Sequence, residues 1–192
     1  MGLYEDIKTY EPFNEQEVCD QRMMLSFLEK NCQDYLLRSN ETAHITVSAW
    51  TVNEKRDKVL MIYHNIYDSW SWVGGHADGI ENLKEVAERE LREETGVEHI
   101  KLLSENIFSL ESLTVDGHEK RGVYVPSHLH LNITYLFEAC EMDTLAMKPD
   151  ENSGVRWCSL KEAVTLPNEP WMVQRIYQKL LNRMQTAPWN EL

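Results

Sequence analysis

The sequence predicts an α/β fold in which helices lie on both sides of a mixed β-sheet. Segments with helical periodicity occur before, between and after segments with strand periodicity, as in a sheet sandwiched by helices. Residues 58–63 are apolar on both faces, which is typical of a central strand. Residues 127–139 alternate apolar and polar side chains, as in a strand whose two faces differ. With 192 residues, the chain has the size of one domain.

The first predicted element is a helix that begins at Asn14 and runs to about Leu37. Asn14 is a favoured N-cap residue, and Glu17 three positions later completes a capping-box arrangement. Because this helix precedes every predicted strand, we expect an N-terminal helical extension, residues 1–40, ahead of a main domain, residues 41–192. The extension would pack on the core or on a second subunit, so a homodimer is compatible with its pattern but not required by it.

The remaining elements follow from hydrophobic periodicity and turn residues. Two strands flank the turn NEKRD, and a helix that ends at Gly96 follows them. Two more strands surround a turn at Asp116 and Gly117, and a short strand and a last helix complete the chain. The predicted ranges are 44–52, 58–63, 106–115, 127–139 and 155–160 for the strands and about 170–185 for the last helix.

Charge and composition exclude several classes of partner. The formal net charge of -13 argues against non-specific binding to nucleic acid, which depends on neutralising phosphates with Lys and Arg. A small phosphorylated ligand remains compatible with this charge, because a bound metal reverses the local sign. No apolar run is long enough to span a bilayer, and the first residues do not form a signal peptide. The four cysteines lack metal-ligand spacing, so we expect reduced thiols, mostly in the core, and a cytoplasmic protein.

The second half of residues 74–97 is predicted to be an acidic helix. At roughly 100° per residue, three apolar side chains fall on the same stripe as Glu90. They are Leu83, Val86 and Ala87. Glu94 lies about 40° from Glu90 around the helix, and Glu93 lies about 60° away on the other side. The apolar stripe therefore becomes acidic as it approaches the end of the helix.

Carboxylates beside a core are costly unless they are paired or bind a cation. A divalent, oxygen-preferring ion such as Mg²⁺ or Mn²⁺ would resolve that cost. Periodicity alone leaves a second interpretation open, in which the carboxylates point into water or pair with Arg89 and Arg92.

The spacing of these residues resembles the Nudix box. Gly75 is followed after five residues by Glu81, and after seven more by the run REL-x-EE-x-GV at residues 89–97. The order of strands and helices is also similar to the Nudix fold, an α/β/α sandwich with a mixed sheet. His76 lies in the loop part of the box and is expected to be a loop residue rather than a ligand.

The Nudix resemblance implies a metal-dependent hydrolase of a nucleoside diphosphate linked to another moiety, X. Such substrates include nucleotide sugars, ADP-ribose-like molecules and NTP-like molecules. The stretches WVGGHADG, VPSHLHLN and DENSGVRW look like a bacterial subgroup of the family to which we attach no substrate.

The resemblance also implies roles for individual box residues. The metal ligands would be the carbonyl oxygen of Gly74 and the carboxylates of Glu90, Glu93 and Glu94. Arg89 would orient a carboxylate through a bidentate contact.

A further acid is expected outside the box. Glu151 lies six residues before Trp157, where the family often places a metal ligand or general base. Its alternative role is that of a solvated turn acid. The general base would be Glu90, Glu93 or Glu151, whichever lies within hydrogen-bond reach of the attacking water.

Substrate-binding side chains are predicted from the strand and turn patterns. His128 and His130 project from the polar face of their strand, where they would contact a base, sugar or phosphate if that face lines the cleft. If the face is turned to solvent, they are surface residues. Lys120 and Arg121 follow a turn and would bind a terminal phosphate or carboxylate, unless they are ordinary hairpin charges. Trp70 is expected at the mouth of the cleft.

Two other functions use the same fold. An isomerase similar to the isopentenyl-diphosphate type needs a cysteine at the substrate carbon, and neither Cys140 nor Cys158 has a recognisable context for that role. A non-catalytic module that binds a nucleotide-derived ligand would show eroded box glutamates, whereas this box is intact. We therefore expect a hydrolase with a small-molecule diphosphate substrate, Mg²⁺ or Mn²⁺ as cofactor, and no nucleic-acid or membrane partner.

Overall fold

The computed structural model describes residues 2–120 and 122–191, and of Lys120 it describes only the backbone. Within these residues, eight strands form one mixed sheet. They are β1 (Ala43–Val52), β2 (Lys58–His64), β3 (Ser69–Ser71), β4 (Val73–His76), β5 (Ile100–Leu102), β6 (Ser109–Val115), β9 (His128–Ala139) and β10 (Asn152–Ser159). The main order is β10-β2-β1-β9-β5, with β3 beside β2, β4 beside β1 and β6 beside β9. All five predicted strands are present, although β6 begins three residues later than expected.

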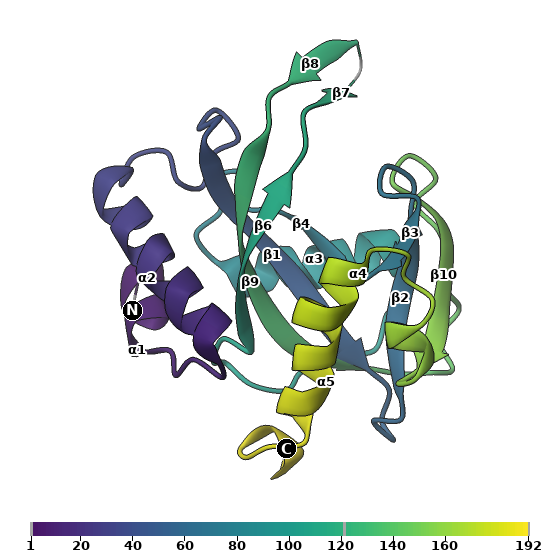
Figure 1. Cartoon of the computed structure of the whole chain (residues 1–192). Coiled ribbons are helices and arrows are strands. Elements are labelled where there is room, and N and C mark those ends of the chain that lie inside the picture. Colours follow the sequence, from purple (N-terminus) through teal and green to yellow (C-terminus); the bar gives the residue numbers. More distant parts are fainter. Residues whose placement is uncertain (1, 121, 192) are drawn as a thin grey trace.

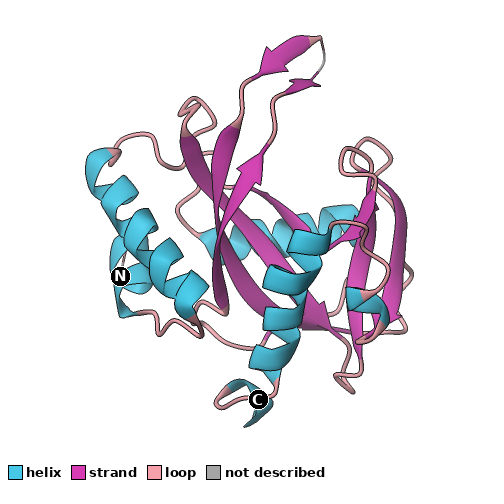
Figure 2. Ribbon diagram, in the orientation of Figure 1, coloured by secondary structure: helices cyan, strands magenta, loops and turns pink. Residues whose placement is uncertain are grey.

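Helices cover both faces of this sheet (Figures 1 and 2). They are α1 (Leu3–Thr9), α2 (Glu15–Lys30), α3 (Leu83–Thr95), α4 (Pro170–Met172) and α5 (Gln178–Met184), with the π-helical segment η2 (Val173–Tyr177) between the last two and the 3-10 turns η1 (Glu162–Val164) and η3 (Trp189–Glu191). The last helix is thus a nearly continuous helical stretch, as predicted. The predicted α/β/α architecture is confirmed.

Two hydrophobic clusters lie on opposite faces of the sheet. Side chains of β1 alternate between them, because successive residues of a strand point to opposite faces. Ile45 and Val47 belong to the cluster under α3, whereas Trp50 belongs to the cluster under the C-terminal helices. Trp72 packs edge-on against Tyr177 in the second cluster, as expected for a core residue.

The central strands β1 and β9 run parallel and pair over ten residues, from Ala43 opposite Leu129 to Val52 opposite Glu138. β4 pairs with β1 on an antiparallel register that places His76 opposite Thr46. These two registers bring one end of β1, the loop part of the box and the start of β9 together. The same end carries the hairpin of β7 (His118–Lys120) and β8 (Val123–Val125), which extends away from the sheet (Figure 1).

The N-terminal segment differs in part from the prediction. Asn14 is the N-cap of α2, and its side chain accepts a hydrogen bond of 3.0 Å from the backbone N–H of Glu17. The helix ends at Lys30 rather than near Leu37, because Asn31 leaves the helical conformation and its side chain donates to a carbonyl of the last turn. A further helix, α1, precedes it and was not predicted.

Glu17 does not complete the expected capping box. Its buried carboxylate accepts hydrogen bonds from the Tyr10 hydroxyl and from the backbone of Phe13, and it pairs with Lys179 and Arg183 of the C-terminal helix. Ile7, Met24 and Leu28 of α1 and α2 also belong to the hydrophobic cluster under α3. The first two helices are therefore tied to the rest of the chain. The division at residues 1–40 and 41–192 stays a prediction.

Two further expectations concern the thiols and the membrane. Cys158 is buried, but Cys19 and Cys32 are exposed and Cys140 is partly exposed, so the expectation that the thiols mostly fill the core is wrong. Among the described residues, no helix combines the length and the apolar character needed to cross a bilayer.

Candidate active site

The box loop packs closely against both β1 and α3 because two consecutive residues have no side chain. A Cβ atom on Gly74 would lie 2.5 Å from the carbonyl oxygen of Val47, and one on Gly75 would lie 2.5 Å from Cδ of Glu90. Only glycine permits such close approach. At the other end, α3 is terminated by Gly96 with φ of 76°, as predicted from its position after the last periodic residue.

The helical-wheel prediction for α3 holds for two of its three inner carboxylates. Glu90 is 9% exposed and Glu94 is 3% exposed, whereas Glu93 is exposed. Glu85 and Arg92 of the same helix are exposed, and Glu88 is partly exposed. The helix therefore places two carboxylates, not three, against the sheet.

Glu151, which precedes β10, completes a group of three carboxylates with Glu90 and Glu94. One oxygen from each of the three lies within 4.8 Å of the others. Oε2 of Glu94 is buried and has no hydrogen-bond partner among the described residues. Glu94 is also tied to β10 through its backbone, because the side chain of Asn152 donates to its carbonyl oxygen at 3.0 Å. Sequence spacing thus identified a residue that folding brings to the box helix.

Burial makes this group strongly unfavourable in the absence of a cation. Burial, followed by the charges of Glu151 and Glu90, raises the pKa of Glu94 to about 9. Burial also raises the pKa of Glu90, although Arg89 opposes it. Three oxygen donors with an unpartnered oxygen suit a hard divalent cation, so the donor set fits Mg²⁺ or Mn²⁺.

Two basic residues border the carboxylates. Nη2 of Arg89 donates to Glu90 Oε1 at 2.7 Å, and its Nε lies 3.8 Å from Glu93 Oε1. Arg89 therefore contacts two different carboxylates, rather than one in the expected bidentate manner. Lys148, which the sequence analysis did not identify, lies 3.0 Å from Glu93 Oε2 and 3.1 Å from Glu151 Oε2. The one feature of the sequence that could have identified Lys148 is its position three residues before Glu151.

Burial alone would lower the pKa of Lys148, but its hydrogen bonds to Glu93 and Glu151 raise it, so the ammonium group is charged. Glu93 lies at the edge of the site, paired with this lysine. Gly74, the other expected ligand, lies in β4 next to the glycine that contacts Glu90.

The polar face of β9 is buried in its middle and partly buried at its start. In its middle, Asn132 and Thr134 are buried and donate hydrogen bonds of 3.0 and 2.8 Å to Glu111 Oε2. At its start, the partly buried His128 and His130 lie against two further histidines. These are His44 of β1 and His76 of β4.

The four imidazoles form one cluster. The ring centroids of His44 lie 5.2 Å from His76, 4.9 Å from His128 and 5.1 Å from His130, and His76 lies 4.8 Å from His130. The sequence analysis did not foresee His44, and it interpreted His76 as a loop residue. Only the parallel register of β1 on β9 reveals that His44 stands opposite His130.

The remaining predicted substrate residues lie apart from one another. Trp70 packs between Tyr63, with ring centroids 5.5 Å apart, and the guanidinium group of Arg156 at 5.5 Å. Lys120 lies in β7, but its side chain and the whole of Arg121 fall outside the described residues.

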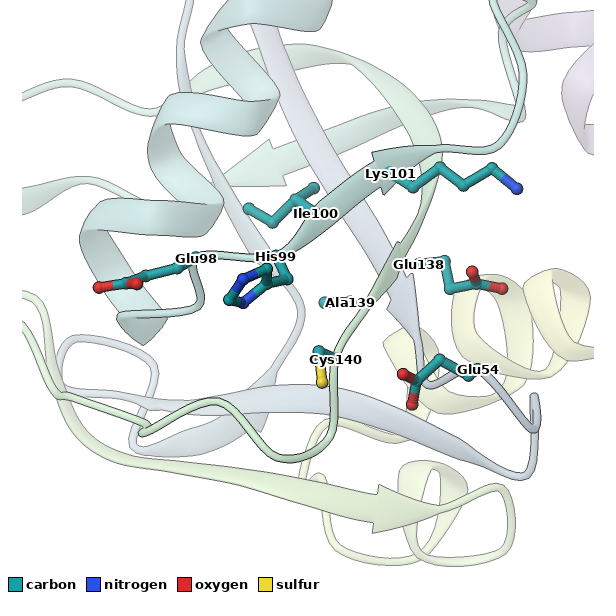
Figure 3. A pocket seen from close by; sticks show the side chains of 8 residues that line it. All are labelled: Glu54, Glu98, His99, Ile100, Lys101, Glu138, Ala139 and Cys140. Atoms are coloured by element: carbon teal, nitrogen blue, oxygen red, sulfur yellow. The ribbon is translucent and has the colours of Figure 1, made fainter.

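A pocket of about 410 Å³ lies away from both clusters, between β5 and the end of β9 (Figure 3). Acidic, basic and apolar side chains line it, and none of the predicted site residues is among them. The lining residues are Glu54, Glu98, His99, Ile100, Lys101, Glu138, Ala139 and Cys140. This pocket therefore does not coincide with the acidic site.

Several known proteins resemble this chain. A Nudix hydrolase of Clostridium perfringens has a TM-score of 0.52 and 20% identity, over 72% of this chain and 97% of that one. The MutT protein of Methanosarcina mazei Go1 has a TM-score of 0.54 and 19% identity, over 77% and 99%. The Ap4A hydrolase of C. elegans, in a binary complex, has a TM-score of 0.51 and 19% identity, over 73% and 93%. At sequence identities this low, the similarity is evidence for a shared fold only. No curated protein sequence matches the chain.

The sequence itself matches the family description of the NUDIX domain over residues 42–180, which is more than half of its length. The match includes the glycine loop, the acidic face of α3 and Glu151. The chain therefore belongs to the Nudix family of pyrophosphohydrolases.

Proposed function

We propose that the protein hydrolyses the diphosphate linkage of a nucleoside diphosphate joined to another moiety X, with Mg²⁺ or Mn²⁺ held by Glu90, Glu94 and Glu151. The observation that carries the proposal is the convergence of these three carboxylates around the unpartnered oxygen of Glu94. A buried acidic group of this kind is expensive to maintain for stability alone, which favours a functional role.

A bound divalent ion would supply neutralisation of phosphate charge and a lowered pKa of the attacking water. Glu90, which lies against the box loop, and Glu94, one turn further along α3, would hold the ion in place. Arg89 keeps the Glu90 carboxylate oriented through its hydrogen bond. These residues are held by packing before any substrate arrives, as an efficient electrostatic site requires.

Glu151 is our choice for the group that accepts the proton from water. It belongs to the carboxylate group, and its side chain is more exposed than those of Glu90 and Glu94, so water can reach it. Glu93 is paired with Lys148, so its expected contribution as a metal ligand or base requires this ion pair to open. Glu90 is the third candidate base, and the pH profile of each Gln variant distinguishes the three.

The moiety X would be recognised by residues beyond the carboxylates. We keep Trp70, Lys120, Arg121, His128 and His130 as the proposed substrate contacts. Burial lowers the pKa of His130 to about 2, so His130 would contact a substrate as a neutral hydrogen-bonding ring rather than as a cation. The C. elegans structure is of an enzyme named for Ap4A, which makes that compound one reasonable test substrate.

The test is a phosphate-release screen with Mg²⁺ or Mn²⁺, using ADP-ribose, nucleotide sugars, Ap4A, NADH, nucleoside triphosphates and isoprenoid diphosphates. A phosphatase is coupled where the products require it. We expect metal-dependent release from one substrate class, lost in Glu94→Gln and retained in Glu85→Gln. The latter variant is a matched control, because Glu85 is exposed on the same helix.

Other outcomes identify the competing functions. Rearrangement of an isoprenoid diphosphate without phosphate release would indicate the isomerase. Tight binding of a nucleotide without turnover, unaffected by Glu94→Gln, would indicate a binding module. Either result would contradict the proposal.

A further inference from the structure

We propose that His44, His76 and His130 form a binding site for a transition-metal ion of the Zn²⁺ type, chemically separate from the carboxylate site. The three residues come from β1, β4 and β9, and one ring nitrogen from each lies within 4.8 Å of the others. Imidazole nitrogens are ligands that suit Zn²⁺, Co²⁺, Ni²⁺ and Cu²⁺ rather than Mg²⁺.

The spacing of the rings is close to that of a formed site. With Zn–N distances of roughly 2.0–2.1 Å and tetrahedral angles, ligand nitrogens are separated by about 3.3 Å. The observed separations therefore need to shrink by no more than about 1.5 Å, which small rotations of the rings supply. No change in the backbone register of β1, β4 or β9 is needed.

His44 carries the second, independent observation. Its Nδ1 lies 3.1 Å from the carbonyl oxygen of Asn40, which is only an acceptor, so Nδ1 bears the proton. In the neutral ring, Nε2 then carries a lone pair. This atom is buried, in a side chain that is 3% exposed, and has no hydrogen-bond partner among the described residues. A backbone carbonyl on the other nitrogen is the arrangement that orients histidine ligands in metal sites.

A neutral imidazole presents a nitrogen lone pair, which binds a cation and not an anion. Asp78, close by in the loop, is already paired with Arg38 and is not a ligand in this proposal.

His128 borders the site without belonging to it. Its Nδ1 lies 2.8 Å from the carbonyl oxygen of Pro126, and its Nε2 lies 3.2 Å from Nε2 of His130. A purely structural cluster of stacked rings would explain these contacts, but it leaves Nε2 of His44 buried without compensation. The fourth position of a three-histidine site is open to water or to a substrate oxygen.

A bound ion would link β4, which already pairs with β1, to β9 as well. His76 follows Gly74 and Gly75 directly, so an ion on His76 fixes the segment that contacts Glu90. With such an ion bound, His130 would contact the ion, and the ion would contact the substrate. The inference concerns binding alone and does not depend on the proposed hydrolysis.

The test is a titration of chelator-treated full-length protein with Co²⁺, in a large excess of Mg²⁺ that occupies oxygen-ligand sites. We expect one equivalent of Co²⁺ to bind with the visible absorption of a nitrogen-ligated, four-coordinate ion, and Zn²⁺ to displace it. His76→Ala should weaken the Co²⁺ affinity at least tenfold. Glu94→Gln and His99→Ala should leave it unchanged, since His99 is exposed and paired with Asp143 elsewhere.

His44→Gln is the second ligand variant, and it should weaken Co²⁺ binding to a similar extent. Thermal unfolding of each metal-free variant shows whether that variant is folded. If His76→Ala is unfolded, His76→Asn replaces it in the titration. Equal Co²⁺ affinity in the wild type and in the folded histidine variants would overturn the proposal. Absence of the absorption bands, or their loss in Glu94→Gln, would do the same.

Discussion

The two clusters beside the box loop offer a cation opposite kinds of ligand. On one face of the sheet, Glu90, Glu94 and Glu151 present hard oxygen atoms, one of them buried and unpartnered. On the other face, histidines present nitrogen lone pairs, again with one buried atom unpartnered. Metal preference follows ligand softness, so the first cluster suits Mg²⁺ or Mn²⁺ and the second a Zn²⁺-type ion.

The two faces are separated by a single step along β4. Gly75 faces Glu90, and the next residue, His76, faces His130. Successive side chains of a strand point to opposite faces, so one four-residue strand contributes to both clusters. The comparison teaches that the box loop is fixed by what lies on both sides of it, not by α3 alone.

The largest effect is expected for the buried carboxylate. Glu94→Gln removes the negative charge of one metal ligand while keeping the side-chain volume. A catalytic metal ion stabilises the transition state by several kcal/mol. We expect kcat to fall at least ~10³-fold. Steady-state kinetics with the screened substrate measure it, with Glu85→Gln as the matched control. Full activity in Glu94→Gln would remove this residue from the metal site.

The next largest effect is expected for the loop itself. Gly75→Ala would place a Cβ atom 2.5 Å from Cδ of Glu90 and so displace that carboxylate. Misplacement of a catalytic group by about 1 Å costs about 10²-fold in rate. Gly2→Ala is the control, because nothing lies within 4 Å of its Cβ position. Unchanged kcat in Gly75→Ala would show that the loop yields without moving Glu90.

The pH dependence of folding stability tests the carboxylate cluster without any substrate. The folded-state pKa of Glu94 is raised from 4.5 to about 9, so the folded protein retains a proton that the unfolded chain has lost. Its contribution is thus fully present below pH 4.5 and is lost as the pH rises towards 9, by at most ~1.4 kcal/mol per pH unit. Urea unfolding of metal-free protein measures this slope. Glu94→Gln should flatten it, whereas an identical slope in that variant would refute the assignment.

A smaller effect is expected at the edge of the carboxylate site. Lys148→Met removes a positive charge 3.1 Å from Glu151, and the repulsion of an incoming cation falls by about 1 kcal/mol, or about fivefold in affinity. Calorimetric titration with Mn²⁺ should show this tighter binding. Lys84→Met, at an ion pair with the exposed Glu105, is the control. Weaker Mn²⁺ binding in Lys148→Met would mean that the lysine organises the ligands instead of competing with the ion.

An effect of similar size is expected on the histidine side. His128→Ala removes one hydrogen-bonding ring, so KM for the true substrate should rise by roughly threefold to tenfold with little change in kcat. Michaelis–Menten measurements on the variant test this expectation. If KM and kcat both stay at wild-type values, His128 is not a substrate contact.

Local patterns predicted the parts of the fold that depend on neighbouring residues. Asn14 and Gly96 mark helix ends because capping is a local matter, and the periodicity of α3 correctly placed Glu90 and Glu94 inward. The end of α2 was wrong, since Asn31 stops the helix with its own side chain while apolar spacing continues to Leu36.

Long-range contacts could not be predicted from these patterns. Glu17 has the spacing of a capping-box residue, yet partners more than 160 residues away determine its position. Likewise, His44 gains its significance from the parallel register with β9, which no local pattern specifies.

A titration with Mn²⁺, followed by electron paramagnetic resonance, tests the central claim most directly. We predict bound Mn²⁺ in the wild type, at least tenfold weaker binding in Glu94→Gln, and wild-type binding in His44→Gln. Equal Mn²⁺ affinity in the wild type and Glu94→Gln would contradict the assignment of the ion to the carboxylates of Glu90, Glu94 and Glu151.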